Sequence, residues 1–220
     1  MIVPDEIEQY AAEHVTPHDA LLAELAEETR ATLECPQMLT GPIEGRLLGF
    51  LVWSLRAKSV LEIGTYSGYS AISMATGLGE GGRIDTLELS EQHAEVARRY
   101  IERAAFADRI TVHVGPAGET LERLDGPWDF VFIDADKEGY VGYYEAVVPK
   151  LSDHALIAAD NTLSSGRVLE GDVMHDFNEH VLNDPRVESV LLTVRDGVTL
   201  IRLRPLTQRG APPLHAVPAG

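Results

Sequence analysis

Apolar residues repeat at helical spacing in the N-terminal part of the chain. Leu21, Leu22 and Leu25 fall on one side of a helix, and Leu47 and Leu48 begin a second apolar stripe. The segment before them is polar, and we expect it to form a loosely attached helix. The pattern predicts N-terminal helices over residues 4–14, 17–33 and 42–55.

After residue 58 the pattern changes to short apolar runs that alternate with amphipathic stretches. Short runs bounded by glycine or acidic residues are typical of strands that are buried on both faces. Ser90 is placed to cap the helix that follows it. The predicted strands cover residues 59–63, 83–87, 109–114, 128–133, 155–159, 187–194 and 198–203, and the predicted helices cover residues 67–76, 90–104, 140–149 and 168–182.

Repeated strand–helix units indicate an α/β fold, in which a parallel sheet is covered by helices on both faces. Asp196 and Gly197 lie between the last two strands and predict a hairpin, which makes one C-terminal strand antiparallel. We expect a single domain over residues 1–204, with accessory helices in residues 1–57 and the core in residues 58–204. The tail, residues 205–220, is rich in Pro, Gly and Ala and is expected to be flexible.

Composition and charge narrow the class of protein. The chain has 220 residues, of which 45% are hydrophobic and 24% are charged, so it can bury a sizeable core and is not globally disordered. The formal net charge of -17 argues against nucleic-acid binding and against adhesion to an anionic membrane. The same charge fits a protein that binds cations.

Compartment signals point to the cytoplasm. The single cysteine, Cys35, excludes an intramolecular disulfide, so nothing indicates an oxidising compartment. The N-terminus has neither the basic start nor the apolar core of a signal peptide. No apolar run approaches the roughly 20 residues that a membrane-spanning helix needs. We therefore expect a cytoplasmic protein with no membrane partner.

The first predicted strand runs into a loop from Glu62 to Ser70 that contains Gly64 and Gly68. In a doubly wound sheet, ligands bind beyond the carboxyl ends of the strands, where glycine lets the backbone approach a ligand closely. Tyr66 stands where the second glycine of a dinucleotide-binding fingerprint would be. The loop therefore predicts a cofactor site but disfavours a pyrophosphate.

Two acidic residues favour a different cofactor. Glu62, just before the first glycine, suits a cationic ligand, and Glu88 ends the second strand, where an acid that binds ribose is expected. Together they indicate a ribose-bearing cofactor with positive charge and no pyrophosphate. S-adenosylmethionine fits this description.

Polar side chains also follow two later strands. Asp134 and Asp136 come directly after the strand at 128–133, and Asp160 and Asn161 follow the strand at 155–159. If these strands are neighbours, the side chains meet at one edge of the sheet and form a site of hard oxygen ligands. Mg²⁺ is the natural occupant, and Mn²⁺ or Ca²⁺ would also suit it.

Four segments match a known family in the same order along the chain. They are Met-Leu-Thr-Gly-Pro-Ile-Glu-Gly at 38–45, the loop from Glu62 to Ser70, Phe-Ile-Asp-Ala-Asp-Lys at 132–137 and Asp-Asn-Thr-Leu at 160–163. Through them, residues 37–203 resemble the class I cation-dependent O-methyltransferases of the caffeoyl-CoA and catechol type. The resemblance implies a Rossmann-like, doubly wound sheet of seven strands, mostly parallel with a C-terminal antiparallel strand, plus N-terminal accessory helices. It also implies a homodimer.

The resemblance further implies roles for individual residues. Lys137 matches the family's catalytic lysine, beside Asp134, and Asp136 and Lys137 would face the substrate. Asp134, Asp160 and Asn161 would hold the metal. The residues implied for the S-adenosylmethionine site are Thr40, Glu62, Gly64, Thr65, Ser70, Glu88, Ala117, Asp134 and Tyr143.

The implied reaction methylates one hydroxyl of an ortho-dihydroxy aromatic small molecule. Lys137 would take the proton of the attacking hydroxyl, and the oxygen would attack the sulfonium methyl in line. One departure concerns the acceptor, because many relatives have an aromatic residue after Asp-Asn-Thr-Leu. This chain has Ser164, Ser165 and Gly166 there. The change removes a wall over the substrate and leaves the identity of the acceptor open.

Other classes of protein fit part of the pattern. An NAD-type oxidoreductase would share the fold and Glu88, but it would leave the Asp134, Asp160 and Asn161 set unexplained. A non-catalytic module that binds a nucleoside or a metal would bind the cofactor without transferring a methyl group. An RNA methyltransferase is disfavoured by the acidic charge.

Overall fold

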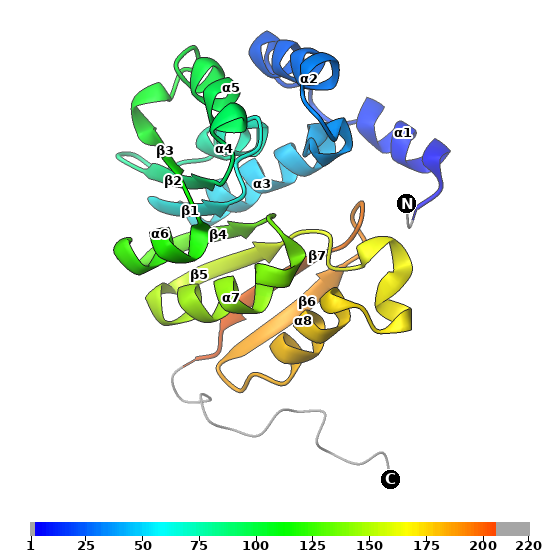
Figure 1. Ribbon diagram of the computed structural model, residues 1–220, viewed down its shortest axis with the longest axis vertical. Helices are drawn as coiled ribbons and strands as arrows, with labels where there is room; N and C mark the ends of the chain where they lie inside the picture. The colour runs from blue at the N-terminus through cyan, green and yellow to red at the C-terminus, as the bar shows by residue number, and fades with distance from the viewer. Residues whose placement is uncertain (1–2, 206–220) are drawn as a thin grey trace.

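A mixed β-sheet with helices on both faces forms the body of the protein in the computed structural model, which describes residues 3–205 (Figure 1). Within these residues, seven strands are ordered β3-β2-β1-β4-β5-β7-β6. Neighbours among β1 to β5 are parallel, whereas β7 is antiparallel to both β5 and β6. The predicted sheet, with one antiparallel C-terminal strand, is therefore confirmed. The strands are β1 (Ser59–Ile63), β2 (Arg83–Glu88), β3 (Ile110–Val114), β4 (Trp128–Ile133), β5 (Leu151–Ala159), β6 (Val187–Leu192) and β7 (Val198–Leu203).

The central strands are buried on both faces, because successive side chains of a strand point to opposite sides. In β4, Phe130 packs into the core on one face of the sheet and Val131 packs into the core on the other. Val60 and Leu61 of β1 divide in the same way. This two-sided burial accounts for the continuous apolar runs in the sequence.

The helices form the two layers that complete these cores. The first core contains residues of α2 (Ala20–Thr32), α3 (Gly41–Leu55), α4 (Tyr69–Ala75) and α5 (Glu91–Ile101), and the second contains residues of α6 (Ala117–Arg123), α7 (Tyr140–Val147) and α8 (Val173–Leu182). The first helix, α1 (Asp5–Glu13), has no buried residue, in line with the loose attachment expected from its polar sequence. Short 3₁₀ segments are η1 (Pro36–Met38), η2 (Ala107–Arg109), η3 (Lys137–Gly139), η4 (Val148–Lys150) and η5 (Ser164–Glu170).

Side-chain caps fix several helix starts. Ser90 accepts a hydrogen bond from the backbone N–H of His93, so the predicted cap is confirmed. Asp19 caps α2 by accepting from the N–H of Leu22, and the helix therefore begins at Ala20 and not at residue 17.

Several predicted elements differ from the structure in their bounds, and one helix was not predicted. The helix expected over 168–182 begins only at Val173, because Gly171 is left-handed, with φ of 82°, and ends a separate 3₁₀ segment. The helix expected from residue 67 begins at Tyr69, because the left-handed Gly68 precedes it. Helix α6 was not predicted, because it buries only Thr120 and Leu121 and therefore shows no apolar stripe in the sequence.

Residues 206–220, where the flexible tail is expected, lie outside the described residues. The domain boundaries at residues 57 and 204 stay predictions. Among residues 3–205, no helix is both long and apolar enough to cross a membrane.

Candidate active site

A cavity of about 1290 Å³ opens beyond the carboxyl ends of the central strands. Its walls include the loops after β1, β2, β3, β4 and β5, the segment before α3, and the β6–β7 turn. Strand order reverses between β1 and β4, which is where doubly wound sheets bind their ligands. The cavity wall includes these predicted site residues: Thr40, Gly64, Thr65, Ser70, Glu88, Ala117, Asp134, Asp136, Lys137, Tyr143, Asp160 and Asn161.

The glycine loop is held against two neighbouring strand ends. The N–H of Gly64 donates to the carbonyl of Leu87 at 3.0 Å. A Cβ on Gly64 would lie 2.0 Å from the carbonyl oxygen of Asp134, and the φ of this glycine is +104°. Tyr66 is itself left-handed, with φ of 48°, so it takes a backbone conformation that a glycine would accept more readily. The backbone of the loop is therefore left-handed at the position of the second fingerprint glycine, although Tyr66 stands there.

Glu62 lies behind the cavity wall. Its side chain is fully buried, and it is absent from the described residues that line the cavity. One oxygen accepts a hydrogen bond from the hydroxyl of Thr86 at 2.5 Å. Burial raises the pKa of Glu62 to about 8, against the opposing effect of hydrogen bonds from Ser70 and Thr86. Its predicted contact with the cofactor remains a prediction.

Glu88 ends β2 at the cavity wall, where the sequence placed it. One oxygen accepts from the N–H of Ser90 at 2.8 Å and the other accepts from the N–H of Tyr66 at 2.7 Å. These bonds fix the carboxylate where a ribose-bearing ligand could donate its hydroxyls to it.

The two aspartates at the ends of β4 and β5 lie side by side. Ile133 and Ala159 are partners in the parallel pair, and the N–H of Asp160 donates to the carbonyl of Ile133 at 2.9 Å. Asn161 follows in a left-handed conformation, with φ of 57°, and its amide donates to Asp160 at 3.1 Å. The predicted convergence depends on β4 and β5 being neighbours, which they are.

This end of the cavity concentrates buried negative charge. Asp160 is 3% exposed, and its Oδ1 has no hydrogen-bond partner in the part of the chain that is described. Burial, and next the neighbouring Asp134 carboxylate, raise the pKa of Asp160 to about 7. Residues 3–205 contain no group of three or more His, Cys, Asp or Glu side chains arranged to hold a metal. The set of Asp134, Asp160 and Asn161 offers two carboxylates and one amide, and this oxygen donor set fits a hard cation.

A buried ion pair beside the aspartates was not among the predicted site residues. Glu44 is 1% exposed, and its Oε2 lies 2.6 Å from Nη1 of Arg195 in the β6–β7 turn. Burial raises the pKa of Glu44 well above its ordinary value, and Asp160 adds to this effect, while Arg195 opposes it. Glu44 lies inside the matched 38–45 segment, whereas no local pattern marks Arg195 as its partner.

Lys137 is fixed at the edge of the aspartate group. Its Nζ donates to Oδ1 of Asp134 at 3.1 Å and to the hydroxyl of Tyr140 at 2.6 Å. The Tyr140 ring is fully buried, and its hydroxyl lies within hydrogen-bond distance of the carbonyls of Ile133 and Asp160. Tyr140 therefore positions the lysine, and sequence reasoning missed it because a core tyrosine carries no local signal.

Asp136 and Tyr143 form a second polar pair on the cavity wall. The Tyr143 hydroxyl donates to Oδ1 of Asp136 at 2.5 Å. Burial raises the pKa of Tyr143, and this hydrogen bond adds to the effect, so the phenol stays protonated. The pair can therefore present a carboxylate oxygen to a ligand without a charged phenol beside it.

The loop after Asn161 lies on the cavity wall, where the resemblance to the family led us to expect an aromatic residue. Ser164, Ser165 and Gly166 are all left-handed, with φ of 49°, 54° and 88°. The Ser164 hydroxyl donates to Asp172 and accepts from Nη2 of Arg167 at 2.9 Å. Ser164 is thus buried in a polar network that holds the loop.

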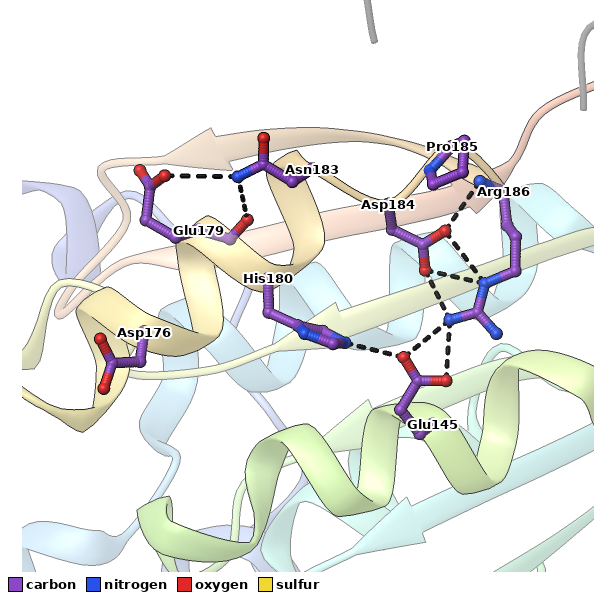
Figure 2. A pocket seen from close by; sticks show the side chains of 8 residues that line it. All are labelled: Glu145, Asp176, Glu179, His180, Asn183, Asp184, Pro185 and Arg186. Atoms are coloured by element: carbon purple, nitrogen blue, oxygen red, sulfur yellow. Dashed lines mark hydrogen bonds and ion pairs between the residues drawn. The ribbon is translucent and has the colours of Figure 1, made fainter. Parts of the chain in front are cut away.

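A second hollow, of about 610 Å³, lies between α7, α8 and the start of β6 (Figure 2). Figure 2 shows Arg186 between Asp184 and Glu145, with His180 turned toward Glu145. These side chains are bonded to one another, and Asp184 also accepts from the hydroxyl of Tyr144 at 2.7 Å. We interpret the network as a structural connection between helices and not as a reactive site.

Comparisons with known proteins identify relatives of this chain. A model of the O-methyltransferase family matches residues 11–204. A catechol O-methyltransferase of Mycobacterium tuberculosis is 44% identical over 151 residues, which cover 68% of each chain. Caffeoyl-CoA O-methyltransferase 5 of Nicotiana tabacum is 31% identical over 92% of each chain. The solved structure of an O-methyltransferase from Bacillus cereus in complex with SAH is 34% identical and has a TM-score of 0.83, covering 90% of this chain and 97% of that one.

Proposed function

We propose that this chain, which belongs to the O-methyltransferase family, uses a divalent cation to methylate one hydroxyl of an ortho-dihydroxy aromatic small molecule. Dependence on S-adenosylmethionine and transfer to oxygen are properties of the family to which it belongs. The proposal adds two points to these family properties, namely the use of a divalent cation and the class of acceptor. Membership of the family, and not the fold, disfavours the oxidoreductase and the non-catalytic module as alternatives.

One observation carries the proposal. Among residues 3–205, the buried Oδ1 of Asp160 has no hydrogen-bond partner, and Asp160 lies at the same end of the cavity as Asp134. Lys137 is hydrogen-bonded to Asp134. Buried carboxylates are costly unless they are protonated, paired or bound to a cation. A cation site next to a lysine would suit the methylation of a vicinal diol.

The cofactor would occupy the part of the cavity near β1 and β2. Glu88 would accept hydrogen bonds from its ribose, and Gly64 and Thr65 would let the backbone approach it. Thr40, Ser70 and Ala117 lie on the same cavity wall. Glu62 would act from behind this wall by ordering the hydroxyls of Ser70 and Thr86.

The metal would be held by Asp134, Asp160 and Asn161. When bound, a divalent cation would stabilise a phenolate on the acceptor, which is otherwise scarce near neutral pH. In its neutral amine form, Lys137 would accept the proton of the attacking hydroxyl at Nζ, and Tyr140 and Asp134 would hold that nitrogen in place. The new bond forms between that oxygen and the methyl carbon as the carbon–sulfur bond breaks.

The class of acceptor is supported by the names of the relatives. The Mycobacterium tuberculosis protein is named for catechol and the tobacco protein for caffeoyl-CoA, and both catechol and the caffeoyl group carry vicinal hydroxyls. We expect a similar small aromatic substrate here, and neither a nucleic-acid nor a membrane partner. A homodimer and a cytoplasmic location also stay predictions.

The test compares a catechol with its 1,3-dihydroxy isomer, with and without a chelator. We expect methylation of the vicinal diol only, loss of turnover with EDTA, and recovery with Mg²⁺. Asp160→Asn should weaken Mg²⁺ binding while SAH binding, followed by calorimetry, persists. Full turnover of the vicinal diol in excess chelator would exclude the role of the metal.

A further inference from the structure

The turn between β6 and β7 contacts two separate segments of the cavity wall. Arg195 and Asp196 both line the cavity, although the proposed reaction uses neither of them. Each makes a different set of bonds, and each set reaches a different segment.

Arg195 reaches toward the segment before α3. Its Nη1 lies 2.6 Å from Oε2 of the buried Glu44 and also donates to the carbonyl of Thr40. Its Nη2 donates to the carbonyl of Leu39 at 3.4 Å. One guanidinium therefore fixes both the backbone and a buried carboxylate of the wall that carries Thr40.

Asp196 and Gly197 reach toward the loop after Asn161. The N–H of Ser165 donates to Oδ1 of Asp196 at 2.6 Å, and the N–H of Leu163 donates to its carbonyl at 2.9 Å. The N–H of Thr162 donates to the carbonyl of Gly197 at 3.0 Å. These bonds hold the loop whose serines replace the expected aromatic residue.

The conformation of the turn is consistent with a positioning role. Arg195 is left-handed, with φ of 49°, which is uncommon for a long side chain and persists only where the surroundings determine it. A Cβ on Gly197 would lie 2.6 Å from Cγ of Leu163, so the turn and the loop are in close contact.

We propose that the β6–β7 turn positions the two walls of the active site through separate residues. Arg195 holds the cofactor-side wall at Leu39 and Thr40, and Asp196 holds the acceptor-side loop at Leu163 and Ser165. Both are positioning residues, because they act through the segments that they hold. The assignment of the two sides rests on the proposed function, which places the cofactor against Thr40 and the acceptor beside the loop after Asn161.

The test separates the roles of Arg195 and Asp196 by measuring cofactor binding and acceptor kinetics in the same variants. Arg195→Met should raise the Kd for SAH about tenfold, with a smaller effect on the KM of the vicinal diol at saturating cofactor. Asp196→Ala should raise that KM about tenfold and leave the Kd for SAH within about twofold. Thermal denaturation of each variant checks that the fold is retained.

Conservative variants separate positioning from simple loss of charge. Asp196→Asn keeps an acceptor for the N–H of Ser165 and should restore the KM, and Arg195→Lys should restore part of the affinity for SAH. In Arg195→Met the buried carboxylate of Glu44 loses its ion-pair partner, and the double variant with Glu44→Gln replaces that carboxylate by a neutral amide. A normal Kd for SAH in this double variant would overturn the role of Arg195, because the defect would then belong to Glu44 alone.

Hydrogen exchange provides a readout that does not depend on the acceptor. Asp196→Ala should speed amide exchange within residues 162–166, most of all at Ser165, whose N–H loses its acceptor, and should leave residues 38–45 unchanged. Arg195→Met should do the reverse. If wild-type protein methylates no vicinal diol, the proposed acceptor fails while the exchange pattern still decides the role of the turn. Equal acceleration of both segments in both variants would show one undivided structural unit and overturn the proposal.

Discussion

At the scale of single residues, the active site depends on acids that are kept away from water. Glu62, Glu44 and Asp160 are each less than 4% exposed. Burial raises the pKa of each carboxyl, because the charged form loses hydration. Such groups lower the stability of the folded protein when they ionise, and they are retained where a ligand or a partner charge balances them.

Glu62 gives a prediction about pH and stability. In the unfolded chain this acid ionises near 4.5, whereas in the folded chain its pKa is about 8. The folded state therefore holds an extra proton between these values, so stability falls as pH rises through this window. Glu62→Gln mimics the protonated acid, and relative to wild type it should gain on the order of 1–3 kcal/mol between about pH 5 and about pH 9. Urea denaturation without cofactor measures the gain, and a difference that does not change with pH would contradict it.

Lys137 gives a prediction about turnover. Lys137→Ala should lower kcat by about 100-fold or more, which is typical for loss of a general base. The Kd for SAH should change by less than about threefold, since this effect falls on the reaction and not on cofactor binding. Lys58→Ala, at an exposed position, is the matched control. A normal kcat in Lys137→Ala would remove this residue from the mechanism.

At the scale of elements, the site is built where loops leave parallel strands. The loop after β1 passes so close to the end of β4 that only a glycine fits at residue 64. Backbone hydrogen bonds that continue the sheet ladder then fix the positions of Asp134 and Asp160. The N–H of Asp134 donates to the carbonyl of Ile63, and the N–H of Asp160 donates to the carbonyl of Ile133. The register of the strands therefore sets the position of the proposed metal ligands.

Gly64 can be tested against another glycine of the same chain. Gly64→Ala should lower stability by about 3 kcal/mol or more and abolish SAH binding, because its Cβ would overlap the Asp134 carbonyl. Gly142 lies inside α7 with open space around it. Gly142→Ala should instead stabilise the protein by about 0.5–1 kcal/mol through helix propensity. Similar stability changes in the two variants, followed by thermal denaturation, would contradict the close contact at Gly64.

The limits of the element prediction have local causes. Long apolar runs such as β4 were found with their observed bounds, because burial on both faces leaves a clear pattern. The prediction started helix α8 too early, at residue 168. The left-handed Gly171 ends the preceding 3₁₀ segment and Asp172 caps the helix, so the apolar residues before them lie outside α8. Asp172 accepts from the N–H groups of Met174 and His175, and this cap sets the true start.

At the scale of the whole molecule, polar networks join elements that are distant in the sequence. Asp184 connects α7 to the start of β6 by accepting hydrogen bonds from Tyr144 and Arg186. Figure 2 shows how Glu145 extends this network from Arg186 to His180 on α8. The network is separate from the cavity that carries Lys137.

This separation predicts a change in stability without a change in catalysis. Asp184→Ala leaves Tyr144 and Arg186 without their shared partner and should cost about 2–4 kcal/mol. Turnover per folded molecule should be unchanged. Glu188→Gln, which breaks an exposed ion pair with Arg202, is the control and should cost less than about 1 kcal/mol. Urea denaturation and kcat at low temperature measure both effects, and a loss of kcat in folded Asp184→Ala would contradict the structural interpretation.

The sequence by itself determined the class of sheet and much of the site. Apolar runs marked the buried strands, and polar residues at their ends, such as Glu88, Asp134 and Asp160, had to face one edge because the carboxyl ends of parallel strands meet there. Only the tertiary structure decided which side chains support that edge from a distance. Tyr140 beneath Lys137 and Arg195 against Glu44 are of this kind. Their partnership depends on strand order and on packing between distant segments, and neither is encoded in the local pattern of hydrophobic and polar residues.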